Sequence, residues 1–541
     1  MSLLAVVSLI LGLLAFAVGL TAAVHALLWK RNPRSAMGWI LLTAFFPVLG
    51  AFLYWFFGVN RIETRARRLD ELSGYVLGSS RPDPRDLGEE ADGAEAPEQS
   101  EPPEDDSLDT GAVPVSGALR SRPEAFAPGE ETLALPDEYR ELARISRAVT
   151  GWPLMPGHRI EVLHDGDEAY PAMLEALASA RHRIVLCTYI FDGYGAGRRF
   201  VDELIAAHRR GVEVKVLIDG VGELYSKPRA RPALEAAGIP VALFLPPSLF
   251  PPNVSVNLRT HRKILVVDGC LAFTGGINIR QRHVLAEQPD EEGVADIHFR
   301  LQGPAAASME SVFLDDWAFV SGGDSQQPEP CAPQRLPASD GITVEASANG
   351  AVTDEAADPG ALCRLVADGP NEDLDKLIMI LIGAISAARH RVAVMTPYFL
   401  PPRSLLSAFQ AAALRGVEVL VVLPQHSNLP PVDWATRNML WELLQRGVRV
   451  VYQRPPFAHS KLFTIDGHYA LVGSTNLDPR SLRLNFELCV EVYHRPTVET
   501  LDRHIDAAAQ QGEPVTLAEV DGRPWPQRLR DSLCWLFSPY L

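Results

Sequence analysis

The chain has 541 residues, of which 47% are apolar, and a formal net charge of −17 at pH 7. This length allows two or three domains with sizeable cores, and the apolar content excludes a mainly disordered protein. The acidic balance disfavours a general nucleic-acid binder, because binding a polyanion relies on a basic surface.

Two stretches near the N-terminus, residues 1–29 and 36–60, contain no Asp, Glu, Lys or Arg. Each is long enough to cross a hydrocarbon core, which takes about 20 helical residues. A cleaved signal peptide is disfavoured, since a basic first region is absent and a second apolar stretch follows at once. We expect a transmembrane hairpin over residues 1–61, with spans at about 4–28 and 38–58.

The second span contains a proline and a glycine, Pro47 and Gly50. We expect Pro47 to kink the helix and Gly50 to allow close helix packing. Lys and Arg residues lie on both sides of this span, so the distribution of positive charge leaves the topology open.

Residues 62–135 are expected to form a juxtamembrane segment followed by an acidic disordered tether. Residues 86–119 alone contain eleven Asp or Glu and no Lys or Arg. Such a composition buries too little apolar area to offset the entropy lost on ordering.

The remainder of the chain contains an internal duplication. "RHRIVLCTYIF" at 181–191 matches "RHRVAVMTPYF" at 389–399, and "RGVEV" follows in each copy. Each copy alternates helical and strand-like segments, which predicts an α/β architecture. We expect a first domain at 136–325, a linker at 326–355 and a second domain at 356–541.

A nine-residue pattern also occurs twice, as "HRKILVVDG" from His261 and "HSKLFTIDG" from His459. The pattern predicts a strand that ends in an Asp-Gly turn. Residues i and i+2 share one face of a strand, so Lys263 projects with His261, and Lys461 projects with His459. "GGIN" and "GSTN" follow the two copies.

A symmetric arrangement of the two copies would bring two His, two Lys and two Asn into one pocket between the domains. One imidazole can attack phosphorus while the other protonates the departing alkoxide and then deprotonates an incoming hydroxyl. Lysines and amides would stabilise the charge on the non-bridging oxygens. Because metal-ligand spacing is absent, we expect neither a metal nor another cofactor.

These residues carry a family resemblance. The two HxKxxxxD motifs, with "GSTNLDPRSLRLNFE", resemble the phospholipase D superfamily, and "NLRTHRKILVVDG", "LQGPAAASMESVFLDDW" and "TPYFLPP" resemble bacterial cardiolipin synthase. The resemblance implies two tandem phospholipase D-like domains, related by a pseudo-twofold axis, behind the transmembrane hairpin. It also implies transfer of a phosphatidyl group between two phosphatidylglycerol molecules, giving cardiolipin and glycerol through a phosphohistidine.

The resemblance also implies roles for individual residues. His261 would be the nucleophile and His459 the general acid/base, each oriented by a carboxylate that follows the Asn of its motif. The catalytic set is His261, Lys263, Asp268, His459, Lys461 and Asp466. The phosphate-binding or orienting set is Asn278, Asn476, Asp296 and Glu487. For Asp268 and Asp466 a role in the turn stays open beside the catalytic one.

The partners implied are phospholipids and a membrane, with no nucleic acid. We expect a multi-pass protein of the bacterial inner (plasma) membrane with a cytoplasmic catalytic domain. A phospholipase D-type hydrolase, or a transferase with another phospholipid or alcohol acceptor, is the alternative, because only competition between acceptors and water separates these activities. The spans and the acidic chain argue against a nuclease, and the intact motifs in both halves argue against a non-catalytic scaffold.

Two smaller features leave structural and functional interpretations open. His283, His298 and His426 lack a partner in the other copy, so we expect packing or surface roles. The C-terminal "RLRDSLCWLFSPYL" mixes basic and bulky apolar residues. It is compatible with contact at the membrane interface or with docking onto the second domain.

Overall fold

The computed structural model describes residues 3–30, 33–55, 133, 135–247, 258–289, 292–322, 360–369 and 375–538. The tether predicted at 62–135 lies outside these residues except for Leu133 and Leu135. The linker predicted at 326–355, and both domain boundaries beside it, also lie outside them.

The N-terminal part forms three helices, α1 (Leu3–Trp29), α2 (Pro33–Phe45) and α3 (Pro47–Leu53). Among the described residues, α1 is the one helix long and apolar enough to cross a membrane, with a mean hydropathy of 2.2 over Ser8–Trp29. The second apolar stretch is divided at Phe46, where φ is −131° and ψ is 73°. Pro47 follows directly and has no N–H to continue the helix. The expected kink is therefore a full break.

The three helices pack against one another through small residues. A Cβ on Gly19 of α1 would lie 2.9 Å from Pro47, so this glycine allows the close approach. Ala22 and Ala26 are buried on the same side of α1. Tyr54 lies 2.7 Å, through its hydroxyl, from Nδ1 of His25. Gly50 instead lies against Leu42 of its own stretch, inside the break.

The part of the chain that contains the duplication is built on one mixed sheet, which contains fifteen strands among the described residues. The first copy contributes β1 (Met155–His164), β2 (Arg183–Thr188), β3 (Glu213–Asp219), β4 (Val241–Phe244), β5 (Ile264–Val267), β6 (Leu271–Gly275) and β8 (Ile297–Gln302). The second contributes β9 (Ala361–Asp368), β10 (Arg391–Met395), β11 (Glu418–Pro424), β12 (Arg449–Gln453), β14 (Leu462–Ile465), β15 (Tyr469–Gly473), β16 (Glu487–Tyr493) and β17 (Glu513–Pro514).

The strand order reads the same outward from the centre in both directions, except that β17 adds one edge strand to the second copy. It runs β17-β12-β11-β10-β14-β15-β16-β9-β1-β8-β6-β5-β2-β3-β4, so β9 and β1 meet in the middle. They pair antiparallel, with Met155 opposite Cys363 and His158 opposite Ala361. Away from this junction β2 pairs parallel with β3, as β10 does with β11. The duplicated α/β architecture predicted from the sequence is confirmed.

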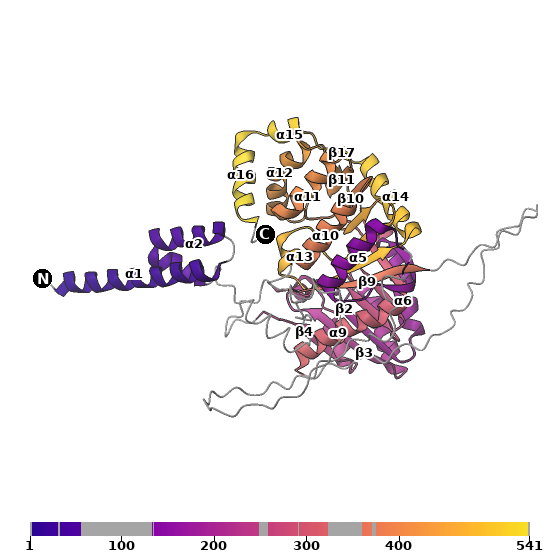
Figure 1. Cartoon of the computed structure of the whole chain (residues 1–541). Coiled ribbons are helices and arrows are strands. Elements are labelled where there is room, and N and C mark those ends of the chain that lie inside the picture. The colour runs from indigo at the N-terminus through magenta and orange to yellow at the C-terminus, as the bar shows by residue number, and fades with distance from the viewer. Residues whose placement is uncertain are drawn as a thin grey trace, which may run out of the picture.

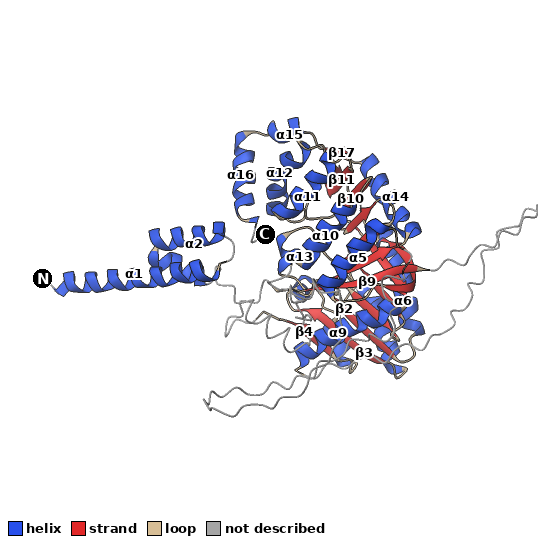
Figure 2. Cartoon of the chain, in the orientation of Figure 1, coloured by secondary structure: helices blue, strands red, loops and turns tan. Residues whose placement is uncertain are grey.

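Helices cover both faces of the sheet (Figure 2). In the first copy these are α6 (Asp165–Ser179), α7 (Ala196–Arg209), α8 (Arg231–Ala236) and α9 (Pro304–Ser321). The second copy matches them with α10 (Lys376–Ala387), α11 (Arg403–Leu414), α12 (Pro430–Leu444) and α14 (Arg495–Gln511). The further helices are α5 (Asp137–Thr150), α13 (Pro479–Arg483), α15 (Leu517–Asp521) and α16 (Trp525–Leu536), with short 3₁₀ turns η3 (Gly222–Tyr225), η5 (Gln281–His283) and η6 (Leu285–Glu287).

The core follows the alternation of side chains along each strand. In β2, Ile184 and Leu186 lie in the core beneath α6 and α7, whereas Val185 and Cys187 face the opposite side with α9. The core on that opposite side contains buried residues of both copies, so the copies share one hydrophobic interior. Figure 1 shows the second copy continuing directly from the sheet of the first. Cys187 is buried as a free thiol, as predicted.

Candidate active site

The two histidine motifs lie where one copy meets the other. His261 precedes β5, and its backbone N–H donates to the carbonyl of Phe486 at 2.8 Å. The N–H of Phe486 in turn donates to the carbonyl of Arg259 at 2.8 Å, and Thr260 forms a parallel β-bridge with Phe486. A two-stranded pairing between the copies thus fixes the backbone at His261.

His459 is held in the same way from the other copy. The short strands β13 (Phe457–Ala458) and β7 (Val294–Ala295) pair parallel, with Phe457 opposite Val294. The N–H of His459 then donates to the carbonyl of Ala295 at 2.7 Å. Both histidines and both lysines lie just before β5 and β14, whereas the sequence predicts that they belong to those strands.

Each imidazole is oriented by a carboxylate of the opposite copy. His261 Nδ1 lies 3.0 Å from Oε2 of Glu487, and His459 Nδ1 lies 2.7 Å from Oδ2 of Asp296. We call these two contacts the crossed His–carboxylate pairs. Both carboxylates are fully buried, since Glu487 and Asp296 begin or precede interior strands of the sheet. The structure therefore brings together four residues predicted for the site and exchanges the carboxylates between the copies.

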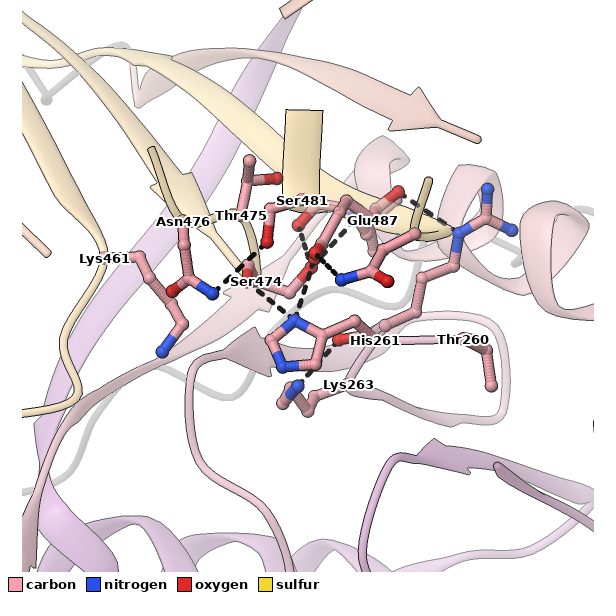
Figure 3. A network of polar contacts seen from close by, with 12 residues as sticks. Thr260, His261, Lys263, Lys461, Ser474, Thr475, Asn476, Ser481 and Glu487 are labelled. Carbon is pink, nitrogen blue, oxygen red and sulfur yellow. Dashed lines mark hydrogen bonds and ion pairs between the residues drawn. The ribbon is translucent and has the colours of Figure 1, made fainter. Parts of the chain in front are cut away.

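The surroundings of His261 fix the position of its proton. Nδ1 faces two acceptors, Glu487 Oε2 and the carbonyl of Ser474, each at 3.0 Å (Figure 3). An N–H must point at them, which leaves Nε2 with its lone pair. Glu487 itself accepts from the Ser474 hydroxyl at 2.5 Å and from the Asn485 amide at 3.1 Å. These bonds hold the carboxylate in place.

His459 has a different set of neighbours. Lys461 Nζ lies 2.9 Å from His459 Nδ1, beside Asp296. The other oxygen of Asp296 accepts the N–H of Ile297 at 2.8 Å. The backbone of Asp296 makes two hydrogen bonds with Asp165. Its N–H donates to the Asp165 carboxylate at 2.7 Å, and its carbonyl accepts the N–H of Asp165 at 2.8 Å.

The two lysines lie on the side of His261 that is away from Glu487 (Figure 3). Lys263 Nζ donates to the carbonyl of His261 at 2.7 Å, and Lys461 donates to the carbonyl of His459. Burial lowers the pKa of Lys263 to about 7 and that of Lys461 to about 8. Both lysines therefore have pKa values close to neutral pH. An anion bound in the pocket would favour their charged forms.

Burial also lowers the pKa of both histidines. For His261 the carboxylate of Glu487 opposes this effect, whereas for His459 the charges of Lys461 and Lys263 add to it and hold its pKa well below the ordinary value. Both shifts favour the uncharged rings in the unliganded protein. For Glu487, burial acts to raise the pKa, but the neighbouring His261 and Lys263 outweigh it and lower the pKa.

The two asparagines occupy matched positions after β6 and β15. Asn278 is buried, and its side-chain oxygen accepts the N–H of Ile190 at 3.3 Å. Asn476 is buried as well and donates to the Ser481 hydroxyl at 3.2 Å, which leaves its Oδ1 without a hydrogen-bond partner. Figure 3 shows the Asn476 side chain between Lys461 and Ser481.

The two aspartates of the motifs lie at the far ends of β5 and β14, four strand residues beyond the lysines. Asp268 accepts the backbone N–H groups of residues 181–183 at 2.8 to 3.0 Å. Asp466 accepts those of residues 389–391 at 2.6 to 2.8 Å. Both have positive φ, at 52° and 49°, in Asp-Gly turns. They thus anchor the turns that begin β2 and β10, which is the turn role left open for them beside the catalytic one.

Several residues beside the motifs complete the site. The Tyr189 ring lies 5.5 Å from that of His261, and the His283 ring lies 6.4 Å from that of His459. Asp219 accepts the N–H of Thr260 at 2.9 Å and so supports the backbone before His261. In the sequence Asp219 ends the buried strand "KVLID", which is the one signal that marks it.

Of the three histidines expected to have packing or surface roles, His426 is exposed and the other two have structural surroundings. His283 and His298 are buried, and burial lowers the pKa of His283 to about 3 and that of His298 to about 4. His283 Nδ1 lies 3.1 Å from the carbonyl of Val294, in the strand that holds His459. The packing role expected for His283 thus includes support of the active-site backbone.

Family models and known proteins match most of the chain. A model described as cardiolipin synthase, PLD-like domain, matches residues 173–317 and 381–508, and a phospholipase D-nuclease N-terminal model matches residues 17–58. A cardiolipin synthase of Oceanobacillus iheyensis is 28% identical over 99% of this chain and 100% of its own length. Cardiolipin synthase A of Pseudomonas aeruginosa is 30% identical over 87% of this chain and 84% of its own length.

A solved structure shows the same fold. The phosphatidylserine synthase of Haemophilus influenzae aligns with a TM-score of 0.55 at 15% identity, covering 74% of this chain and 100% of that protein. Together with the crossed His–carboxylate pairs, these matches show that the chain belongs to the bacterial cardiolipin synthases of the phospholipase D superfamily and is an enzyme of that type.

Proposed function

We propose that this enzyme joins two phosphatidylglycerol molecules into cardiolipin and releases glycerol, through a phosphohistidine intermediate. The observation that carries the proposal is the crossed His–carboxylate pairs, in which His261 faces Glu487 and His459 faces Asp296. They provide two separately oriented imidazoles beside two buried lysines. Phosphodiester exchange needs one imidazole to bond phosphorus and another to move the proton.

In the first step Nε2 of His261 attacks the phosphorus of the donor lipid. The P–O bond to glycerol breaks as the P–N bond forms, and protonated His459 gives its proton to the leaving glycerol oxygen. Lys263 and Lys461 neutralise the charge on the non-bridging oxygens. The products are free glycerol and a phosphatidyl group on His261.

In the second step His459, now neutral, takes the proton from a hydroxyl of the acceptor phosphatidylglycerol. That oxygen attacks phosphorus and the P–N bond breaks, which restores His261. His459 ends protonated, so the proton that it gave to glycerol is replaced by the proton of the acceptor hydroxyl and the cycle balances. Water in place of the acceptor would give phosphatidic acid, the hydrolytic outcome.

The surroundings of the two rings support this division of roles. Two acceptors at Nδ1 of His261 keep its Nε2 lone pair available, as a nucleophile requires. At His459 the charges of Lys461 and Lys263 lower the pKa. A bound phosphodiester anion would offset those charges and raise the pKa of His459, so that protonation of the acid accompanies substrate binding.

We also propose that the N-terminal helices form a two-span membrane hairpin, with the catalytic part on the cytoplasmic side. Support for the hairpin comes from the apolar length of α1 and from the close packing of α2 and α3 against it at Gly19, whereas the cytoplasmic side follows from the resemblance to bacterial cardiolipin synthase. Protease digestion of intact cells and of inverted vesicles tests the orientation: cleavage of the tether only in inverted vesicles is expected, and cleavage in intact cells contradicts it.

The function is tested with purified full-length enzyme and phosphatidylglycerol labelled in its terminal glycerol. Cardiolipin and labelled glycerol in equal amounts are the expected products. Phosphatidic acid with glycerol would show a hydrolase, and adding other phospholipids or alcohols reports on other acceptors. Acid-labile, base-stable label retained on the protein from phosphorus-labelled substrate, and lost in His261→Ala, is expected for the phosphohistidine.

A further inference from the structure

Arg262 lies between the histidine and the lysine of the first motif, but its side chain extends into the interior between the two copies. The residue is 3% exposed, and its guanidinium group makes contacts in three directions. Nη1 donates to the carboxylate of Asp316 on α9 at 2.6 Å. Nη2 donates to the carbonyl of Asp368 at the end of β9 at 2.9 Å, and Nε donates to the carbonyl of Glu487 at 3.2 Å. The side chain thus connects the first copy to two strands of the second.

The bond to Glu487 has the most direct consequence for the active site. Two consecutive residues of the first copy hold this glutamate: His261 Nδ1 lies 3.0 Å from its carboxylate, and Arg262 donates to its carbonyl. The Arg262 guanidinium also lies 5.4 Å from the centre of the ring of Phe486, whose carbonyl accepts the N–H of His261. A shift of the backbone at Glu487 would therefore move its carboxylate relative to the imidazole.

The second copy lacks a matching contact among the described residues. The residue that matches Arg262 there is Ser460, whose side chain is too short to bridge to a neighbouring strand and helix. The backbone of Asp296, which orients His459, is bonded to Asp165 of its own copy. Arg262 therefore supports one of the two crossed His–carboxylate pairs and not the other.

The ion pair with Asp316 is a poor explanation for Arg262 by itself. A buried ion pair contributes little net stability, because the desolvation of both groups offsets their attraction. A guanidinium group is planar and presents several donors at fixed angles, which a lysine does not. The side chain is therefore suited to fixing the positions of the backbone groups that it contacts.

We propose that Arg262 is a positioning residue for the nucleophile: it holds the backbone of Glu487, so that the carboxylate keeps the His261 imidazole aimed at phosphorus. Arg262 acts through Glu487 and does not touch the substrate. A misplacement of the reacting groups by about 1 Å can slow a reaction by about 10²-fold, so such support has a measurable effect. The inference rests on the function proposed above, in which His261 bonds phosphorus.

The test is the variant Arg262→Lys in the full-length enzyme, with a phosphatidyl donor that has a p-nitrophenol leaving group. Because this leaving group needs no general acid, its release reports bond formation at His261. Lysine keeps the charge opposite Asp316, but its single nitrogen cannot also contact the carbonyl of Glu487. We expect the rate of the first turnover at saturating donor to fall about tenfold, with less than a twofold change in the donor concentration that half-saturates it.

Arg364 provides a matched control. It is a fully buried arginine of β9 and pairs with Glu491 of β16 at 3.1 Å, so it joins the same two strands further from the histidines. Arg364→Lys should lower the thermal unfolding temperature about as much as Arg262→Lys does, but it should leave the first turnover unchanged. An equal loss of rate in the two variants would show a general effect of stability and would overturn the proposal.

A second measurement asks whether Arg262 acts through Glu487. In the background of Glu487→Gln, the change Arg262→Lys is expected to slow the first turnover by less than a further twofold, because the orienting carboxylate is already lost. Multiplicative losses would place the effect of Arg262 elsewhere and contradict the proposal, as would a wild-type rate in Arg262→Lys. Should Arg262→Lys not fold, Arg262→Gln/Asp316→Asn replaces the ion pair by a neutral pair of similar shape and has the same expected outcome.

The products separate this inference from the proposed function. Phosphatidic acid as the sole product from phosphatidylglycerol would contradict cardiolipin synthesis. The p-nitrophenol measurement would still decide the role of Arg262, because hydrolysis and transfer share the first step. Normal release of p-nitrophenol by His261→Ala would instead overturn both the nucleophile and the role of Arg262.

Discussion

The two copies of the motif have the same local architecture, but different side chains contact their histidines. His261 faces a carboxylate that two further side chains fix, with acceptors alone at Nδ1. His459 faces a carboxylate with the Lys461 ammonium group beside it. Duplication thus provides two imidazoles, and the neighbours that differ between the copies give them different proton affinities.

The largest effect should come from removing either histidine. His261→Ala and His459→Ala are each expected to lower cardiolipin formation by about 10⁴-fold, because one loses the nucleophile and the other the proton carrier. A donor with a p-nitrophenol leaving group needs no general acid. With it, rapid-quench labelling should show phosphoenzyme in His459→Ala and none in His261→Ala. The reverse pattern would exchange the two roles.

The crossed His–carboxylate pairs predict that each carboxylate acts on the histidine of the other copy. Glu487→Gln and Asp296→Asn are each expected to lower kcat by about 10²-fold through misoriented or wrongly protonated rings. With the p-nitrophenol donor, Glu487→Gln should still slow phosphoenzyme formation, whereas Asp296→Asn should approach the wild-type rate. Equal slowing by both variants would argue against the exchange of partners.

The lysines allow a comparison by pH. Burial lowers the pKa of Lys263 to about 7, so its charge is present below this pH and is lost as the pH rises through it. We expect kcat/KM for phosphatidylglycerol to decline above about pH 7 in the wild type. In the variant Lys263→Arg the guanidinium stays charged at all these pH values. The decline of kcat/KM should therefore move to higher pH, towards the pKa of Lys461, even if the maximum of kcat/KM is lower. An unmoved profile would show that another group controls the decline.

The smallest effect on chemistry is expected at the motif aspartates. Asp268→Asn and Asp466→Asn each weaken the anchoring of three backbone N–H groups, which should cost about 1–2 kcal/mol of folding free energy. Asn tolerates the positive φ of these turns, so backbone strain does not add to the difference in folding free energy between the variants and the wild type. Thermal unfolding should shift down by a few degrees while activity per folded molecule is retained. A loss of turnover comparable to that of the histidine variants would restore the catalytic role.

The sequence predicts the duplicated α/β fold because the patterns that indicate it lie in short stretches and occur in both copies. The apolar runs that become β2 and β10, and the Asp-Gly turns after β5 and β14, follow from alternation and turn chemistry. The residues of the pocket follow as well, since matched positions in a duplicated fold meet at the axis. Both Asp296 and Glu487 are present in that prediction.

What the sequence does not reveal is the exchange of carboxylates between the copies. It depends on the parallel pairing of residues near Thr260 with Phe486, and of β13 with β7, which joins segments about 160 to 230 residues apart. Ser474, Asn485 and Asp219 were missed as supports for the same reason, because short polar residues are common and their contacts are tertiary. At the N-terminus the sequence signals a kink at Pro47, but not that Phe46 ends the helix outright.

The exchange of carboxylates has a consequence for biosynthesis. His261 is complete in the chain well before Glu487, which lies 226 residues later and supplies its acceptor. When the first copy has left the ribosome, the proposed nucleophile is therefore present without its orienting carboxylate. We therefore expect phosphatidyl transfer to be slow until β16 joins the sheet, so the nascent enzyme should be nearly inactive towards the lipid around it until translation is nearly finished.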